Sequence, residues 1–237
     1  METTKAPDIS WKTDDELFSL IRRELFTAVV GDIMDEHGLL HQFLDPSIQP
    51  LKEGMRIVGR AMPVLEADVY PSPKISIDPA INNKPFGLML EALDDLKENE
   101  VYICTGSQNP YALWGELMST RAIKLGAAGV VLDGHVRDTN GILSLGFPCF
   151  CSGRYAKDQG PRGKVIDYRC EITLADVVIK PGDIVFGDID GVCIIPRDHE
   201  ADIIKRAYQK ATGEKKVQKA IQNGMSACEA FEKFGIM

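Results

Sequence analysis

The stretch that most constrains the fold is the segment 126–142, which reads GAAGVVLDGHVRDTNGI. Its run GVVLD, residues 129–133, is apolar without alternation, a pattern typical of a parallel strand buried on both faces. The preceding run WGELMSTRAIKLG reads as a helix that ends at Gly126, where a left-handed residue is preferred. A helix followed directly by a buried strand predicts an α/β layered fold.

The glycines of this segment raise the question of a nucleotide-binding loop. Such a loop places its glycines after a strand and at the start of a helix, so that the pyrophosphate meets helix N–H groups. Here the order is reversed, because GAAG leaves a helix and enters a strand, and the spacing fails the G-x-G-x-x-G template. A dinucleotide or methyl-donor loop is therefore disfavoured. We interpret Gly126 as the helix end and Gly129 as a site of close packing.

Periodicity and turn residues place the other elements. Amphipathic helical spacing begins at Asp14, Thr27 is placed to cap a second helix that ends at Gly38, and Ser226 with Glu229 forms a capping box for a last helix that stops at Gly235. Two strand-like runs are expected in 54–70, one strand ends at Gly106, another occupies 146–153, and three lie within 176–196. We expect a loose arm over residues 1–13 and a single α/β domain over 14–237, with helices closing the chain.

Composition narrows the partners and the setting. The net charge is −8 and the pI about 5.1, which argues against a nucleic-acid partner. Apolar runs are too short to cross a bilayer, and the first residues lack the apolar core of an export signal. The six cysteines include no C-x-x-C pair and lie mostly in apolar runs. Cys149 and Cys151 share one strand face and could bind a soft metal, but burial explains them better. We expect a cytoplasmic protein with reduced thiols.

Polar residues follow the buried strand at its carboxyl end, where sites in α/β folds gather. If the chain stays extended there, His135 and Arg137 face one way and Asp138 the other. If it turns, Arg137 and Asp138 can converge on one ligand. A surface ion pair is an equally open interpretation of these two residues.

A second candidate lies upstream, at the start of the helix that follows Gly115. The N–H groups of Leu117 and Met118 lack intrahelical acceptors there and, with the helix dipole, suit a carboxylate ligand. Glu116 in the same turn is either part of that site or an ordinary acid favoured by the dipole. Twenty residues separate Glu116 from Arg137 and Asp138.

That spacing of an acid, twenty residues and Arg-Asp resembles the motif of the RraA-like family, which includes 4-hydroxy-4-methyl-2-oxoglutarate aldolases with oxaloacetate decarboxylase activity. The similarity extends through TAVVGDIMDEHG, WGELMSTRAIKLGAAGVVLDGHVRD, GFPCF and PGDIVFGDIDGVCIIPRD, most of residues 25–198. The family usually has Asp at the first position, where this chain has Glu116. That departure keeps the charge and extends the reach.

The resemblance implies a three-layer β/β/α swivelling domain, assembled as a homotrimer or as a homohexamer of two stacked trimers. It implies a lyase that cleaves a carbon–carbon bond of a 2-oxo acid, by retro-aldol cleavage or decarboxylation, and gives pyruvate through an enolate. A divalent cation, Mg²⁺ or Mn²⁺, would stabilise that enolate.

The resemblance also implies roles for the site residues. Asp138 would be the metal ligand, since Mg²⁺ commonly takes only one or two carboxylates. Arg137 would stabilise the enolate oxygen and contact substrate. Gly115, Leu117 and Met118 would bind the substrate carboxylate. Glu116 would bind a metal-bound water and help to transfer the proton.

Further residues and a second function stay open. Asp32 and Glu36 could line the site from a neighbouring subunit, and His135 could touch substrate, although solvated or satisfied side chains explain all three. Asp188 and Asp190 are better explained as turn residues than as calcium ligands. The alternative function is a non-catalytic, protein-binding regulator of an RNA-degrading enzyme, which the acidic composition allows. The complete acid–Arg–Asp set favours catalysis.

Overall fold

The computed structural model describes residues 9–73 and 75–236, and these fall into two compact units. Unit 1 combines the chain up to Leu40 with the chain from Asp198 onward, and unit 2 is His41–Arg197. Most of the expected N-terminal arm, residues 1–8, lies outside the described residues, and residues 9–12 carry no helix or strand.

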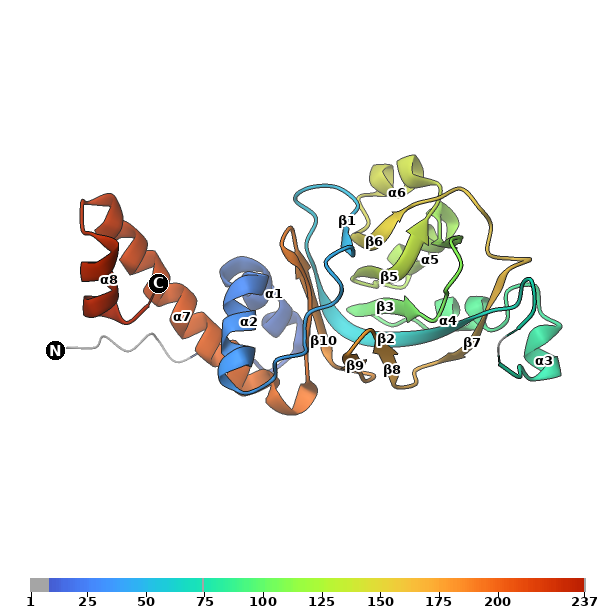
Figure 1. The fold of residues 1–237 in the computed structure, drawn as a ribbon, viewed down its shortest axis with the longest axis horizontal. Helices are drawn as coiled ribbons and strands as arrows, with labels where there is room; N and C mark the ends of the chain where they lie inside the picture. Colours follow the sequence, from blue (N-terminus) through green and yellow to red (C-terminus); the bar gives the residue numbers. More distant parts are fainter. Residues whose placement is uncertain (1–8, 74, 237) are drawn as a thin grey trace. The chain divides into compact units, whose positions relative to one another are not determined.

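Unit 2 is built on a nine-stranded mixed sheet of order β1-β6-β5-β3-β2-β10-β11, with β4 added beside β5 and β7 beside β2. Strands β2, β3, β5 and β6 run parallel to one another and lie side by side in Figure 1. The strands are β1 (Gln49–Pro50), β2 (Ile57–Asp68), β3 (Glu100–Thr105), β4 (Ala112–Trp114), β5 (Gly129–Val136), β6 (Cys149–Arg154), β7 (Gly163–Tyr168), β8 (Ile172–Leu174), β9 (Val177–Ile179), β10 (Ile184–Asp188) and β11 (Gly191–Ile195). The helices of this unit are α3 (Pro79–Asn82), α4 (Met89–Asp94), α5 (Glu116–Lys124) and α6 (Thr139–Leu145).

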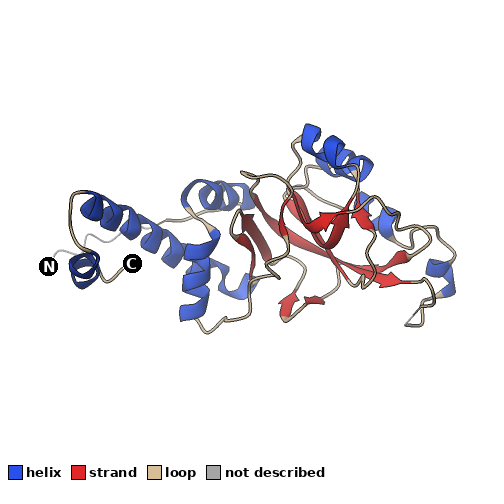
Figure 2. Cartoon of the chain, turned by 45° about the horizontal axis from the view of Figure 1, so that its top comes forward, coloured by secondary structure: helices blue, strands red, loops and turns tan. Residues whose placement is uncertain are grey.

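The central strands are buried on both faces, which gives the unit its three layers. In β3, Tyr102 and Cys104 belong to the core beneath the helices, whereas Val101 and Ile103 belong to the core that β8 and β9 close. Figure 2 shows the small β8–β9 sheet on one side of the main sheet and helices on the other. The predicted α/β class with β/β/α layering is confirmed.

The two strand-like runs expected in 54–70 are one strand, β2, and the prediction of two was wrong. Pro63 is tolerated because β2 changes partner on one side, pairing with β10 up to Arg60 and with β7 from Val64. The Ala61 N–H donates toward that side, to the Asp183 carbonyl. An N–H at position 63 would point to the same side as that of Ala61. Proline lacks this N–H, and its position falls between the part of β2 that pairs with β10 and the part that pairs with β7.

Two glycines at the entry to β5, Gly126 before the strand and Gly129 as its first residue, behave as the sequence predicts. Gly126 is left-handed, with φ of 78°, after the last turn of α5. A Cβ on Gly129 would lie 2.5 Å from Ile57 Cδ1 and 2.7 Å from the Pro148 carbonyl oxygen. Only glycine allows this close approach of β5 to Ile57 and Pro148, because any side chain would clash with them.

Unit 1 is helical, with α1 (Asp14–Glu24), α2 (Thr27–Glu36), α7 (Glu200–Gln222) and α8 (Ala227–Phe234), and a 3₁₀ turn (Arg197–His199) precedes α7. The capping box of Ser226 and Glu229 is confirmed. The sequence predicted that Thr27 caps α2, and this prediction was wrong. It is the first helical residue and is buried, and Phe26 is the N-cap without a side-chain bond. None of the helices in the described part is long and apolar enough to cross a membrane.

Candidate functional site

Pairing of β4 with β5 brings the two candidate segments to one edge of the sheet. The strands are parallel, with Ala112 opposite His135 and Trp114 opposite Val136. Because parallel strands end at the same edge, the residues that follow them meet there. The Arg137 N–H donates to the Trp114 carbonyl at 3.0 Å, which ties the two strand ends together.

Directly after β5 the chain turns, which decides between the two geometries left open by the sequence. Asp138 is left-handed, with φ of 55° and ψ of 35°, and is the N-cap of α6. The turn places Arg137 Nε 4.0 Å from Asp138 Oδ2, and both side chains are about half exposed. A Cβ on Gly115 would lie 2.7 Å from Asp138 Oδ2, so the glycine makes room for this carboxylate. Arg137 and Asp138 therefore lie beside the start of α5.

Glu116 begins α5 and reaches across to α6. A Cβ on Gly141, in the first turn of α6, would overlap the Glu116 carboxyl group. The Gly141 N–H donates to the Asp138 main-chain carbonyl at 2.9 Å, so Glu116 packs against the helix turn that Asp138 caps. Glu116, Arg137 and Asp138 therefore lie at the same edge of the sheet.

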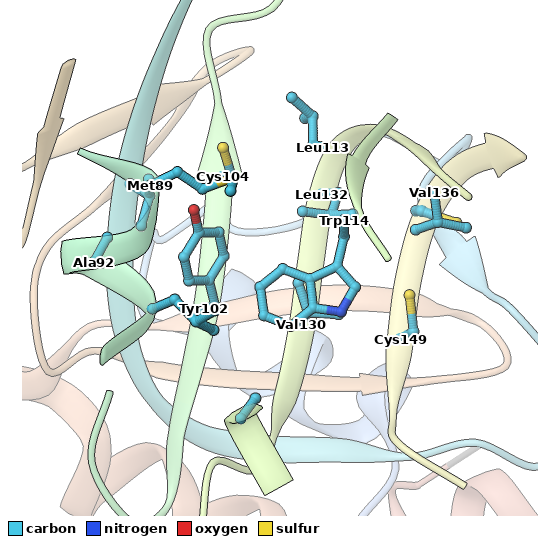
Figure 3. Packing of buried hydrophobic residues seen from close by; sticks show 14 of the residues in the cluster. Met89, Ala92, Tyr102, Cys104, Leu113, Trp114, Val130, Leu132, Val136 and Cys149 are labelled. Atoms are coloured by element: carbon cyan, nitrogen blue, oxygen red, sulfur yellow. The ribbon is translucent and has the colours of Figure 1, made fainter. Parts of the chain in front are cut away.

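The first turn of α5 offers backbone donors. Gly115 is its N-cap and has no side chain with which to cap, so no side-chain cap engages this helix start. The turn is fixed from beneath, because Trp114 Nε1 donates to Ser119 Oγ at 2.7 Å and Ser119 Oγ donates to the Gly115 carbonyl at 3.1 Å. Trp114 is buried beside Tyr102 in the core under α5 (Figure 3). Leu117, in contrast, is 83% exposed.

A residue that the sequence analysis missed completes the surroundings of Arg137. Asp158 Oδ1 lies 2.8 Å from Arg137 Nη1. Asp158 forms a β-bridge with Ala112 of β4, in a loop between β6 and β7. No motif marked this aspartate, because its loop carries neither strand nor helix periodicity, and only the fold brings it to the site.

Behind Asp158 lies a buried polar network that the sequence analysis also missed. Gln159 Nε2 donates to both carboxylate oxygens of Glu66 at 2.9 Å. The Tyr111 hydroxyl lies 3.2 Å from Glu66 Oε1 and 2.9 Å from Asp68 Oδ1, so its single proton can be donated to either carboxyl group. Burial raises the pKa of Glu66 to about 8, although the hydrogen bonds from Tyr111 and Gln159 oppose the rise. Glu66 is therefore mostly protonated at neutral pH.

The remaining candidate residues have other partners. The His135 ring makes an edge contact with Tyr155, their centroids 5.9 Å apart, and faces Gly153 of β6. Asp32 and Glu36 belong to α2 in unit 1, where they pair with Lys210 and Arg206 of α7. Asp188 accepts from the Asp190 N–H at 3.1 Å, as a turn residue does. Cys149 and Cys151 are both buried.

The donors at this edge suit a hard divalent cation. Within residues 9–73 and 75–236 no group of three or more His, Cys, Asp or Glu side chains is arranged as a metal site. The half-exposed carboxylate of Asp138 is a ligand of the kind that Mg²⁺ or Mn²⁺ would take, because these ions bind through one or two carboxylates, waters and substrate oxygens. A closed structural zinc site needs four protein ligands. The residues present therefore fit Mg²⁺ or Mn²⁺ at Asp138.

Comparison with known proteins gives a consistent family. The family model RraA-like (Aldolase/RraA) matches residues 27–194. A protein from Halalkalibacterium halodurans, named "Putative 4-hydroxy-4-methyl-2-oxoglutarate aldolase", is 29% identical over 88% of this chain and 90% of its own length. Protein DlpA of Legionella pneumophila is 28% identical over 88% of this chain, which spans about a third (32%) of that protein.

Solved structures share the fold. One, titled as the crystal structure of novel cellulases from microbes of the gut ecosystem, is 32% identical with a TM-score of 0.75 over 90% of this chain and 91% of the other. RraAS2 of Streptomyces coelicolor, titled an unusual member of the RNase ES inhibitor RraA protein family, is 20% identical with a TM-score of 0.74 over 88% and 99%. At that identity the second likeness shows the fold alone.

The protonation of Glu66 predicts how stability depends on pH. Its pKa is raised in the folded state, so its contribution is complete below pH 4.5 and is lost as pH rises through about 8. Between these values the group lowers the free energy of unfolding by about 1.4 kcal/mol per pH unit.

Urea denaturation at pH 5 to 8.5 tests this with Glu66→Gln, which lacks the titrating group. The free energy of unfolding of this variant should therefore rise relative to that of the wild type as pH increases. Glu171→Gln, at an exposed glutamate, is the control. A pH-independent difference between Glu66→Gln and wild type would contradict the prediction.

Proposed function

Because this chain belongs to the RraA-like family, we propose that its site cleaves a carbon–carbon bond of a 2-oxo acid and yields pyruvate. The substrates would be a 4-hydroxy-2-oxo acid, by retro-aldol cleavage, or oxaloacetate, by decarboxylation. One observation carries the proposal: Arg137 and Asp138 turn together beside the first turn of α5. A guanidinium, a carboxylate and backbone donors then surround one point.

Substrate binding is assigned to the start of α5. The N–H groups of Leu117 and Met118 and the positive end of the helix dipole would hold the substrate carboxylate. Gly115 leaves this end uncovered because it has no side chain. The 2-oxo group, next to the carboxylate, would then lie toward Arg137.

Arg137 is assigned to the charge that forms when the bond breaks. In the aldol reaction a base takes the proton of the 4-hydroxyl, the C3–C4 bond breaks, and its electron pair enters the pyruvate enolate. In decarboxylation the same bond breaks, and CO₂ leaves. The planar guanidinium donors suit the resulting oxyanion, and a preorganised donor stabilises the transition state more than the substrate.

Proton transfer is assigned to Glu116. Its carboxyl group lies against Gly141 of α6, the helix that Asp138 caps, and a carboxylate there would take the hydroxyl proton and return a proton to C3 of the enolate. The protonated enolate is pyruvate, and in the aldol reaction the second product keeps the new carbonyl. Decarboxylation releases no hydroxyl proton, so there the proton that reaches C3 comes from water. Glutamate in place of the usual aspartate extends this reach by one methylene.

We assign a divalent cation, Mg²⁺ or Mn²⁺, to Asp138. When bound it would supply Lewis-acid stabilisation of the enolate. Asp138 is suited to hold it because the carboxylate is half exposed and a left-handed turn aims it at the start of α5.

Two comparisons support the proposal: the match to the RraA-like family model, and the aldolase name of the Halalkalibacterium relative. The alternative, a regulator of an RNA-degrading enzyme, draws on the Streptomyces structure, whose likeness extends to the fold only. Assembly as a homotrimer or homohexamer, with Asp32 and Glu36 near a neighbour's site, stays a prediction.

Removal of the guanidinium tests the proposal. Pyruvate release from oxaloacetate and from 4-hydroxy-4-methyl-2-oxoglutarate is followed with lactate dehydrogenase, with Mn²⁺ and after chelation. We expect turnover with Mn²⁺, its loss on chelation, and a fall of roughly 10²–10³ in kcat/KM for Arg137→Ala.

The matched control is Arg121→Ala, which removes an arginine of similar exposure from α5, paired with Asp94 at 2.7 Å. Pyruvate formed by Mn²⁺ without protein is subtracted. Wild-type protein that releases no pyruvate above this background would refute the lyase and favour the regulator. Near-normal activity of Arg137→Ala would refute the assignment of Arg137.

Glu116 can be tested without being replaced. Gly141→Ala puts a methyl group where the Glu116 carboxyl group lies and forces it away. Alanine favours a helix over glycine by about 0.5–1 kcal/mol, so stability should be kept. We expect kcat/KM to fall roughly tenfold or more, since general acid–base catalysis contributes roughly 10²–10⁴. Ser144→Ala in the same helix is the control. A fully active Gly141→Ala enzyme would argue against a catalytic Glu116.

A further inference from the structure

Asp158 forms an ion pair with Arg137. Its Oδ1 lies 2.8 Å from Arg137 Nη1, whereas the neighbouring Asp138 oxygen is 4.0 Å from Arg137 Nε. The guanidinium has five N–H donors. One contact to Asp158 leaves the N–H donors on the other nitrogen atoms available to a ligand. Asp158 can therefore orient the guanidinium while Arg137 still binds that ligand.

Asp158 is itself fixed at its side chain and its backbone. Its Oδ2 accepts from the Gly160 N–H at 3.2 Å, and its carbonyl accepts from Arg162 Nη1 at 2.8 Å. The Ala112 N–H donates to the Lys157 carbonyl at 2.8 Å, which attaches this loop to β4, the strand that leads into Gly115 and Glu116. The carboxylate thus has a defined position relative to the start of α5.

The next residue anchors the loop in the interior. Gln159 is 4% exposed, and its amide donates to both oxygens of the buried Glu66 side chain. A Cβ on Gly163 would overlap the Tyr111 hydroxyl and Glu66 Oε1, so glycine at the end of the loop lets the chain close over this network. Asp158 therefore extends from a rigid base of buried hydrogen bonds toward Arg137.

Stability alone does not account for the Arg137–Asp158 pair. Both side chains are about two-fifths exposed, and ion pairs at such sites contribute little to folding. Orientation of a charged catalytic group, in contrast, is sensitive to displacements of about 1 Å, which can cost roughly 10²-fold in rate.

We infer that Asp158 is a positioning residue, which sets the direction of the Arg137 guanidinium for the carbon–carbon cleavage. The inference rests on the proposed function for its kinetic consequence, and on the ion pair alone for its effect on Arg137. Loss of Asp158 would let the guanidinium swing away from the developing oxyanion. It would also remove a negative charge that competes with the anionic substrate for Arg137.

The kinetic test uses Asp158→Asn and Asp158→Ala in the full chain. We expect kcat to fall roughly threefold to tenfold in Asp158→Asn, which keeps an acceptor oxygen, and roughly 10- to 100-fold in Asp158→Ala. KM should stay level or fall, because the competing charge is gone. Asp94→Ala, which breaks the exposed pair with Arg121, should leave both constants unchanged. A value of kcat within twofold of wild type in Asp158→Ala would overturn the inference.

A second readout does not depend on activity. Phenylglyoxal reacts with accessible arginines, and peptide mapping by mass spectrometry gives the rate at each one. The rate at Arg137 should rise about threefold or more in both Asp158 variants, since the pair shields that guanidinium. In Asp94→Ala the rate should rise at Arg121 and not at Arg137, which makes this control a positive one for the method.

The two readouts separate the possible failures. An unchanged rate at Arg137 would overturn the inference, whatever happens to kcat. If the wild type releases no pyruvate, the lyase proposal fails, and a raised rate at Arg137 still shows that Asp158 positions it. Thermal melts of both variants check that the folded fraction matches wild type.

Discussion

The parallel pairing of β4 with β5 is the constraint on which the site depends. β4 is only three residues long, yet it ends at the same sheet edge as the buried strand beside it. Two segments separated by twenty residues are thereby joined: Gly115 and Glu116 after one strand, Arg137 and Asp138 after the other. The Trp114 carbonyl accepts from the Arg137 N–H, so one hydrogen bond closes the arrangement. The twenty residues between Glu116 and Arg137 are the rest of α5, the turn after it and β5.

Glycine determines how closely the site can assemble. Gly115 admits the Asp138 carboxylate beside α5, and Gly141 admits the carboxyl group of Glu116 against α6. Neither position requires an unusual backbone angle. Their role is to leave space for two carboxyl groups, and that of Asp138 lies 4.0 Å from the Arg137 guanidinium. Such a site is suited to a cation and to an anionic substrate together.

Local patterns predicted what is local in this molecule. The apolar run of β5 and the left-handed Gly126 are properties of neighbouring residues, and the structure has both of them. What failed depends on distant partners. Pro63 lies inside a continuous strand because β2 exchanges one neighbour for another there. Asp158 reaches Arg137 only through the β-bridge to Ala112, and its loop has no pattern that a sequence reveals.

The central claim is that Asp138 holds a divalent cation while Arg137 and the start of α5 hold a 2-oxo acid. A crystal of the protein with Mn²⁺ and pyruvate tests it most directly, because manganese is identified by its anomalous scattering. We predict manganese bonded to the Asp138 carboxylate at about 2.0–2.4 Å, pyruvate within hydrogen-bond distance of Arg137, and its carboxylate at the N–H groups of Leu117 and Met118. Manganese bound away from Asp138, or pyruvate bound away from Arg137, would contradict the account.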